Sequence, residues 1–162
     1  VFGGSIAYTW PRIPSECEYV LHLEDDFLLL RLLDIQEMVD ILDANPHLVQ
    51  VALLRQPVNE NEKAAGGIWQ QRPQDYTQKS MPTGGFQKVL NWFEHRIVFT
   101  TNPCMYRRSI TARGWTNEEH SEGMFGWRLF QSDANLRSAF FGRMGDPPLV
   151  EHIGTNRVGT GY

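Results

Sequence analysis

The sequence predicts an α/β fold with a mixed, mainly parallel sheet flanked by helices. Residues 19–23 and 48–54 both have the apolar character of buried strands, and a helical pattern occupies the interval between them. A strand, a helix and a second strand with short connections favour a parallel crossover, because parallel strands need a long connection that is usually a helix. The first strand leads directly into Glu24, Asp25 and Asp26, and open α/β sheets bind ligands at the carboxyl ends of their strands.

The composition is that of one ordinary domain, residues 1–162, with 41% hydrophobic and 21% charged residues. The net charge of -4 argues against a protein that wraps nucleic acid electrostatically. No apolar run approaches the ~20 residues of a membrane span, so no transmembrane segment is expected. Cys17 and Cys104 match no metal-ligand or redox spacing, and we expect free buried thiols and a cytoplasmic location.

The first segment places Gly3 and Gly4 ahead of an expected short helix. Ser5 is a suitable N-cap for that helix, and Pro11 is expected to end it. A glycine pair at this place either lets a nucleotide approach the backbone or forms a plain turn. The pattern leaves both interpretations open.

The helix between the two predicted strands begins at a sequence that resembles a capping box. Asp34 occupies the N-cap position, and Glu37 follows at the position that closes such a box. Asn45 and Pro46 end the helical pattern. The apolar residues that recur at helical spacing in between are Ile35, Met38, Val39 and Leu42.

Residues 55–85 are rich in Gln, Asn, Pro and Gly and lack a clear period. So long an irregular stretch in a compact domain is usually functional or disordered, and we interpret it as a lid or an acceptor-binding loop. Trp69 and Tyr76 lie within it. Each is suited either to stacking on a sugar or to anchoring the loop on the surface.

The second half of the chain alternates between strands and helices. Residues 86–93 and 96–101 are predicted strands joined by a turn at Glu94 and His95. The other predicted elements are a strand at 104–106, a helix at 109–113 closed by Gly114, a helix from Ser121 to about Asn135, and strands at 138–141 and 149–153.

The chemistry of the acidic triplet points to a metal. Carboxylates suit Mg²⁺ or Mn²⁺, and these ions keep some of their waters and bridge the phosphates of a substrate. Residues 24–26 are therefore interpreted as a metal–diphosphate site. The alternative is a solvated acidic turn after a strand.

Other acids and a histidine follow the triplet in a definite order. Glu122 stands at the start of a later helix, and His152 ends the last strand. This order resembles the GT-A fold of nucleotide-sugar-dependent glycosyltransferases, and within it the family 2-like enzymes of bacteria and phage. The triplet is similar to the DxD-type motif of that fold in an EDD form. Residues 101–108 resemble the strand that lines the acceptor side, and residues 152–162 resemble the tail of such enzymes.

The resemblance implies a Rossmann-like sheet of which this chain is a partial domain. Members of the family usually have further strands and helices before the metal motif, and these form most of the nucleoside pocket. Gly3 and Gly4 look like the last piece of that N-terminal part. They would then help to bind the donor, a sugar linked to UDP or GDP.

The resemblance also implies ligands for the metal and the donor. Asp26 and His152 would hold Mn²⁺ or Mg²⁺, with Glu24 and Asp25 beside the diphosphate, and Arg157 on the tail would close over it. The metal would neutralise the charge that develops on the leaving diphosphate. A single histidine at this place is also compatible with a purely structural role.

Glu122 is similar to the acid of the family's xED motif and is the expected catalytic base. It would take the proton of an acceptor hydroxyl during a single displacement that inverts the sugar. Glu119, about one helical turn away, is the second candidate. A plainer interpretation is that Glu122 interacts favourably with the helix dipole.

Two other functions stay open on the residues alone. A nucleotidyltransferase would also use carboxylate-held Mg²⁺, and a non-catalytic module would bind a glycan or a partner protein. For a glycosyltransferase the acceptor is a glycan, a protein or a modified DNA base, and the acidic charge balance disfavours the DNA base.

Overall fold

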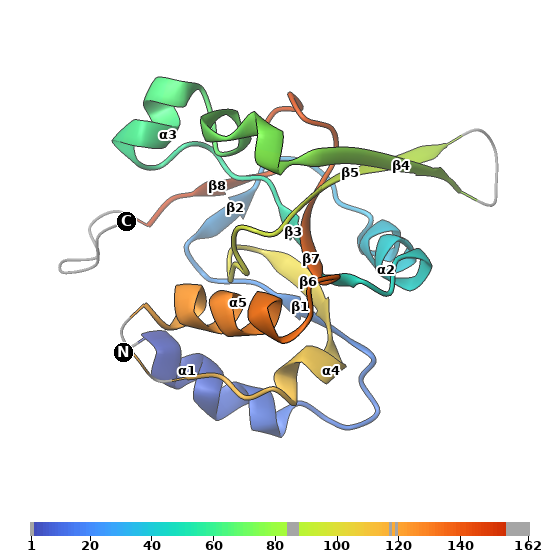
Figure 1. Cartoon of the computed structure of the whole chain (residues 1–162), viewed down its shortest axis with the longest axis vertical. Coiled ribbons are helices and arrows are strands. Elements are labelled where there is room, and N and C mark those ends of the chain that lie inside the picture. Colours follow the sequence, from blue (N-terminus) through green and yellow to red (C-terminus); the bar gives the residue numbers. More distant parts are fainter. Residues whose placement is uncertain (1, 84–87, 117, 119, 155–162) are drawn as a thin grey trace.

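The computed structural model describes residues 2–83, 88–116, 118 and 120–154. It confirms the α/β class, with helices packed around a six-stranded sheet and a separate two-stranded ribbon (Figure 1). In spatial order the sheet strands are β1 (Tyr19–His22), β6 (Cys104–Arg107), β3 (Leu48–Leu53), β7 (Arg137–Phe141), β5 (Val89–His95) and β4 (Thr77–Pro82).

The expectation of a mainly parallel sheet is wrong. The pairs β1–β6, β6–β3, β7–β5 and β5–β4 are antiparallel, and β3–β7 is parallel. The expected crossover does exist, since β1 and β3 both pair antiparallel with β6 and therefore run in the same direction. A strand from later in the chain is inserted between them. Local patterns do not encode such an insertion, because the choice of neighbouring strands depends on packing of the whole chain.

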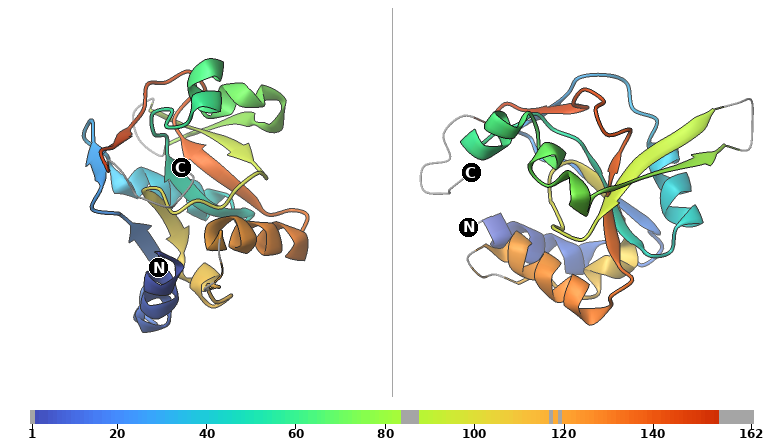
Figure 2. Two further views of the ribbon diagram at one scale, coloured as in Figure 1. Left: turned by 90° about the vertical axis from the view of Figure 1, so that its left-hand side faces the viewer. Right: turned by 45° about the horizontal axis from the view of Figure 1, so that its top comes forward.

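Helices cover both faces of the sheet. On one face, α2 (Ile35–Ala44) buries Ile41 completely, and each such side chain contributes about 1.5–3 kcal/mol of transfer free energy. On the other face lie α1 (Phe2–Thr9), α4 (Arg108–Thr111) and α5 (Ser121–Ser132) (Figure 2). Because both of its faces are covered, β3 is buried at each of its 6 positions.

The helix α2 begins where the sequence predicts, but its cap is simpler than a capping box. The Asp34 side chain accepts a hydrogen bond from the backbone N–H of Gln36 at 3.0 Å. The Glu37 side chain instead accepts one from Lys88 on the β4–β5 hairpin. Asn45 caps the other end, as predicted.

The glycine pair lies inside a helix rather than before one. Because α1 spans Phe2–Thr9, it includes Gly3 and Gly4 and starts ahead of the predicted cap. Glycine is a weak helix former, so the sequence favours a later start. Burial of Ile6 and Trp10 in the core outweighs that local preference. The prediction that this pair precedes a helix is therefore wrong, and the nucleotide contact stays a prediction.

The stretch predicted as irregular is largely regular over residues 55–83. It contains α3 (Glu60–Ala65), the 3₁₀ helices η2 (Trp69–Gln71) and η3 (Pro73–Asp75), and β4. Elements this short have too few residues to show a period. Tyr76 is 8% exposed and packs against 3 aromatic rings, so it is a core residue and not a platform for a sugar.

The predicted turn at Glu94 and His95 is wrong as well. β5 continues through both residues and pairs with β4, whereas residues 96–101 form no strand. His95 is 2% exposed, and its ring stacks on Phe140 at 5.1 Å. Burial in that aromatic cluster favours a straight strand over the turn that two polar residues suggest.

The remaining predicted elements are confirmed within a few residues. The long helix α5 begins at Ser121, and His120 is its N-cap in the left-handed conformation, with φ 55°. The last strand is β8 (Val150–His152), which pairs antiparallel with β2 (Phe27–Leu29) in the two-stranded ribbon. Gly114 follows α4 with φ 72°, as expected of a glycine that closes a helix.

β1 is an edge strand, and its 4 residues are only partly buried. The segment that follows it is exposed and rich in leucine. The exposed apolar side chains near β1 are Leu23, Leu28, Leu29, Leu30, Leu32 and Ile35.

Both cysteines are free, and Cys104 is buried whereas Cys17 is half-buried. Over the described residues, the helices are too short or too polar to cross a membrane.

Candidate functional site

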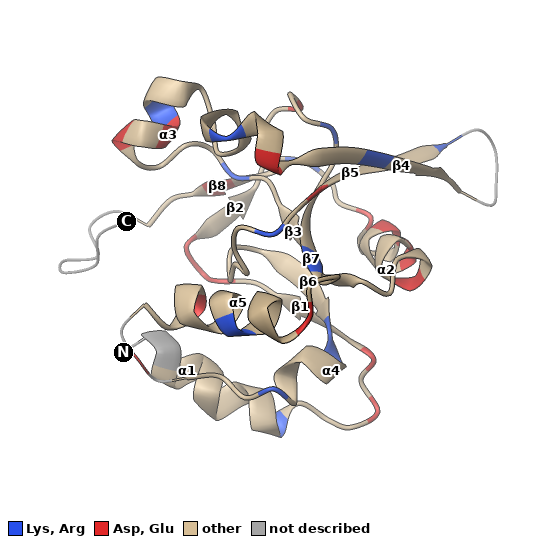
Figure 3. Ribbon diagram, in the orientation of Figure 1, with Lys and Arg blue, Asp and Glu red and all other residues tan. Residues whose placement is uncertain are grey.

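The acidic triplet lies in the connection between β1 and β2. β1 ends at His22 and β2 begins at Phe27, with residues 24–26 between them (Figure 3). His22 pairs with Cys104, the first residue of β6, and Ala52 near the end of β3 pairs with the same cysteine. The triplet therefore follows the edge of the sheet at which β1 and β3 both end, as the sequence predicts.

Asp26 and His152 approach each other through the β2–β8 ribbon. Phe27 pairs with His152 in the ribbon, and the backbone N–H of Ile153 donates to the carbonyl oxygen of Asp26 at 2.8 Å. The Nε2 atom of His152 lies 3.1 Å from Oδ2 of Asp26. The side chain of His152 is 25% exposed, and that of Asp26 is 15% exposed. The structure thus brings together the two residues that the sequence predicts as metal ligands.

Gly154 makes room for this contact. A Cβ atom at this position would lie 2.7 Å from Oδ2 of Asp26 and 3.1 Å from Nε2 of His152. The first distance is shorter than any that real Cβ atoms adopt. The backbone after β8 therefore packs directly against both side chains, and any larger residue would disturb their geometry.

The Asp26–His152 pair fits a divalent ion with an open coordination shell. Carboxylate oxygen and imidazole nitrogen both ligate Mn²⁺, and Mg²⁺ keeps several waters beside one or two carboxylates and substrate phosphates. Among the residues that the structure describes, no group of three or more His, Cys, Asp and Glu side chains could hold a metal. The two side chains would therefore leave the other ligands of such an ion to water and a bound phosphate.

Glu122 lies in the first turn of α5 and is held by Thr101. The backbone N–H and the hydroxyl of Thr101 both donate to Oε1 of Glu122, the hydroxyl at 3.2 Å. Thr101 belongs to the loop that enters β6. The helix packs closely on this loop, since a Cβ atom at Gly126 would lie 2.8 Å from the backbone nitrogen of Phe99. The helix and the loop together fix the position of the Glu122 carboxylate.

Glu24 and Glu122 act on the same buried thiol. Burial raises the pKa of Cys104, and the negative charges of Glu122 and Glu24 raise it further. Because Cys104 begins β6 beside the end of β1, both carboxylates lie at the same edge of the sheet. Oε1 of Glu24 also lies 3.5 Å from Nε2 of His22. The predicted base Glu122 and Glu24 therefore both lie toward the end of the sheet at which β6 begins.

Of the other predicted site residues, the structure describes Asp25, Gly3 and Gly4. Asp25 is exposed in the turn after β1. Gly3 and Gly4 are helical residues of α1. Glu119 and Arg157 lie outside the described residues. The predictions for these last two stay predictions.

Two glutamines that are not among the predicted site residues, one in β3 and one just after it, hydrogen-bond to segments of the site. Gln56, just after β3, bonds the backbone of His152, accepting from its N–H at 2.9 Å and donating to its C=O at 3.0 Å. Gln50 is fully buried, and its side chain accepts from the backbone N–H of Thr100 at 3.3 Å. The sequence signals for these contacts are a polar residue within an apolar strand and a second polar residue just past the end of that strand.

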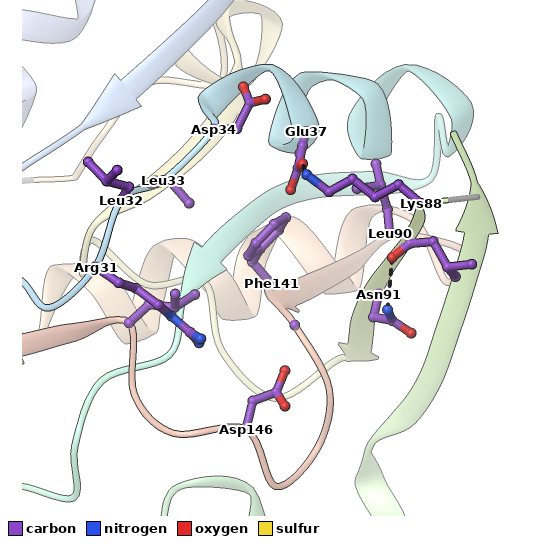
Figure 4. A pocket seen from close by; sticks show the side chains of 13 residues that line it. Arg31, Leu32, Leu33, Asp34, Glu37, Lys88, Leu90, Asn91, Phe141 and Asp146 are labelled. Carbon is purple, nitrogen blue, oxygen red and sulfur yellow. Dashed lines mark hydrogen bonds and ion pairs between the residues drawn. The ribbon is translucent and has the colours of Figure 1, made fainter. Parts of the chain in front are cut away.

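A cavity of about 660 Å³ lies between α2, the β4–β5 hairpin and the loop after β7 (Figure 4). Phe141 and Leu90 belong to its apolar lining, and the charged side chains of Arg31, Lys88 and Asp146 stand around it. None of the predicted site residues that the structure describes lines it. It is thus separate from the Asp26–His152 pair.

A scan of the chain against protein-family models finds no match, and neither does a search of curated protein sequences. The geometry of the site is therefore what supports a function.

Proposed function

We propose that this protein is a metal-dependent, inverting glycosyltransferase. It would move a sugar from a nucleotide-diphosphate sugar to an acceptor hydroxyl. The observation that carries the proposal is the 3.1 Å approach of His152 to Asp26 after β1. The resemblance of the chain to family 2-like enzymes assigns metal binding to these same two residues.

The acidic turn makes chemical sense beside a diphosphate only if a cation lies between them, because carboxylates and phosphates repel each other. Asp26 and His152 would hold that ion, Mn²⁺ or Mg²⁺. Glu24 and Asp25 would stand beside the diphosphate of a UDP- or GDP-linked sugar. When bound, the ion would neutralise negative charge on the leaving group.

Glu122 would act as the general base. Thr101 fixes the carboxylate through two hydrogen bonds to Oε1, so its orientation does not have to be established during the reaction. A positioned base of this kind accelerates proton transfer by roughly 10²–10⁴-fold. Attack by the deprotonated hydroxyl in a single displacement would invert the anomeric centre.

The acceptor is a glycan, a protein or a modified DNA base. The net charge of -4 favours the first two, because binding to DNA rests largely on cationic contacts with phosphates. Free thiols at Cys17 and Cys104 support a reducing, cytoplasmic location.

Calorimetric titration with UDP and with GDP, each with and without Mn²⁺, tests the proposal. We expect one nucleotide to bind in a metal-dependent manner and binding to be lost in Asp26→Ala. Asp75→Asn, which changes an exposed carboxylate in η3, is the control and should bind as the wild type does. Equal binding with and without Mn²⁺ and no sugar transfer would contradict the proposal and favour a non-catalytic binding module.

A further inference from the structure

We infer that Gln56 is a positioning residue for the proposed metal site, whose side-chain amide holds His152 against Asp26. The inference rests on the proposed function, since it concerns the geometry of the same pair. Gln56 belongs neither to the acidic triplet nor to α5, which carries the proposed base Glu122. Its role follows from its contacts alone.

The Gln56 side-chain amide makes the two backbone hydrogen bonds that a neighbouring strand would make with His152. Its Nε2 donates to the carbonyl of His152 at 3.0 Å, and its Oε1 accepts from the N–H of His152 at 2.9 Å. In the antiparallel ribbon, the hydrogen bond from Ile153 to Asp26 makes that pair a hydrogen-bonded one. The next pair, Phe27 with His152, is then non-hydrogen-bonded, and the backbone groups of His152 point away from β2. The glutamine satisfies both of them.

Gln56 is itself held firmly. Leu149 donates to the carbonyl of Leu54 at 2.7 Å, and Arg55 forms a parallel bridge with Val150, so the chain after β3 runs beside β8. The Arg55 guanidinium donates to the carbonyl of Gln56 at 2.9 Å.

The same guanidinium binds a carboxylate of α3. Arg55 donates to both carboxylate oxygens of Glu62, at 2.7 and 3.1 Å. Glu62 is 7% exposed and also accepts from the N–H of Val58 at 2.9 Å. A buried ion pair thus anchors the backbone from which the Gln56 side chain extends.

The ribbon needs this support. Two strands of 3 residues each are marginal on their own, since isolated two-stranded pairs are at best weakly stable in water. Without the amide, the N–H and C=O of His152 lose their partners, and β8 can move relative to the turn that carries Asp26. Partners that orient metal ligands typically change metal affinity by about 10–100-fold when they are removed.

The test compares Gln56→Met with the wild type. Methionine keeps the length of the side chain but makes neither hydrogen bond. Mn²⁺ binding is measured from the electron paramagnetic resonance signal of free Mn²⁺, with UDP and, in parallel, GDP. We expect affinity for Mn²⁺ to fall about 10–100-fold and the backbone amide of His152 to exchange with solvent faster.

Gln78→Met is the matched control. The side-chain amide of Gln78, on the β4–β5 hairpin, also makes two hydrogen bonds to backbone groups. It donates to the carbonyl of Trp92 at 2.8 Å and accepts from the N–H of Met144 at 2.7 Å. Its loss should lower the melting temperature comparably and leave the affinity for Mn²⁺ unchanged. Gln56→Asn, with an amide too short to reach both groups, provides a second variant if Gln56→Met does not fold.

The outcomes separate the two proposals. If Asp26→Ala abolishes Mn²⁺ binding but both folded Gln56 variants bind Mn²⁺ as the wild type does, the positioning role is wrong and the proposed function stands. If Gln78→Met weakens Mn²⁺ binding as much as Gln56→Met, the effect is general destabilisation and the positioning role is again wrong. If the wild type binds no Mn²⁺ with either nucleotide, the proposed function fails, and the inference fails with it.

Discussion

The imidazole of His152 lies 3.1 Å from the carboxylate of Asp26, although 126 positions separate the two residues in the chain. The contact forms because β2 and β8 pair in a ribbon of their own, outside the six-stranded sheet. The ribbon is short, and the end of β3 fixes it through Gln56. The contact between the two proposed ligands is thus assembled from segments that are distant in the sequence.

Asp26 and His152 should behave as one unit in metal binding. Asp26→Ala and His152→Ala are each expected to abolish metal-dependent nucleotide binding, and the double variant should be no worse than either single one. Calorimetry on the four proteins provides the measurement. Metal-dependent binding that persists in either single variant would show that the two residues do not hold the same ion.

Glu122→Gln should slow sugar transfer without weakening the binding of the donor. The amide keeps an oxygen for the hydrogen bonds from Thr101 but cannot accept the acceptor's proton, so kcat should fall by roughly 10²–10⁴-fold. Affinity for nucleotide and Mn²⁺ should not change. Glu118→Gln is the control, because Glu118 is more than half exposed and pairs with Arg128. Transfer at the wild-type rate in Glu122→Gln would assign the base elsewhere.

The two glycines of α5 should respond oppositely to alanine. A Cβ atom at Gly126 would lie 2.8 Å from the backbone nitrogen of Phe99, whereas at Gly123 it would meet nothing within 4 Å. Gly126→Ala is expected to lower the free energy of unfolding by about 1–3 kcal/mol through overpacking. Gly123→Ala should raise it by up to about 1 kcal/mol, because alanine favours helix. Denaturant unfolding of both variants checks this, and equal effects would contradict the packing described for α5.

His95 should make the fold sensitive to mild acid. Burial lowers its pKa from 6.5 to about 4, so between these values the unfolded chain binds a proton that the folded chain does not. The contribution of His95 to stability is therefore complete above pH 6.5 and is lost as the pH falls toward 4. The slope is at most about 1.4 kcal/mol per pH unit.

His95→Phe keeps a ring against Phe140 and cannot titrate. Denaturant unfolding from pH 7 to pH 4 should give a flatter profile for this variant than for the wild type. An unchanged profile would assign the acid sensitivity to other groups.

Elements with a long local pattern could be predicted from the sequence. The helix from Ile35 to Ala44 has a capping residue, a helical period and a stop, and the structure reproduces it. The strand β3 was predicted from its apolar run. By contrast, β4 is not predicted, and β5 is predicted to end at Phe93, because polar residues such as Glu94 are buried there by long-range packing.

The sequence by itself determined which chemical groups the protein carries and where its strands end. It placed three acids directly after β1, an acid at the start of α5 and a histidine at the end of the last strand. The tertiary structure alone decided which of them meet. Asp26 reaches His152 because β8 lies between β2 and Gln56, and Glu122 is fixed because α5 packs on the loop that enters β6. Local periodicity reports only the next few residues, whereas these contacts depend on segments that the whole fold brings side by side.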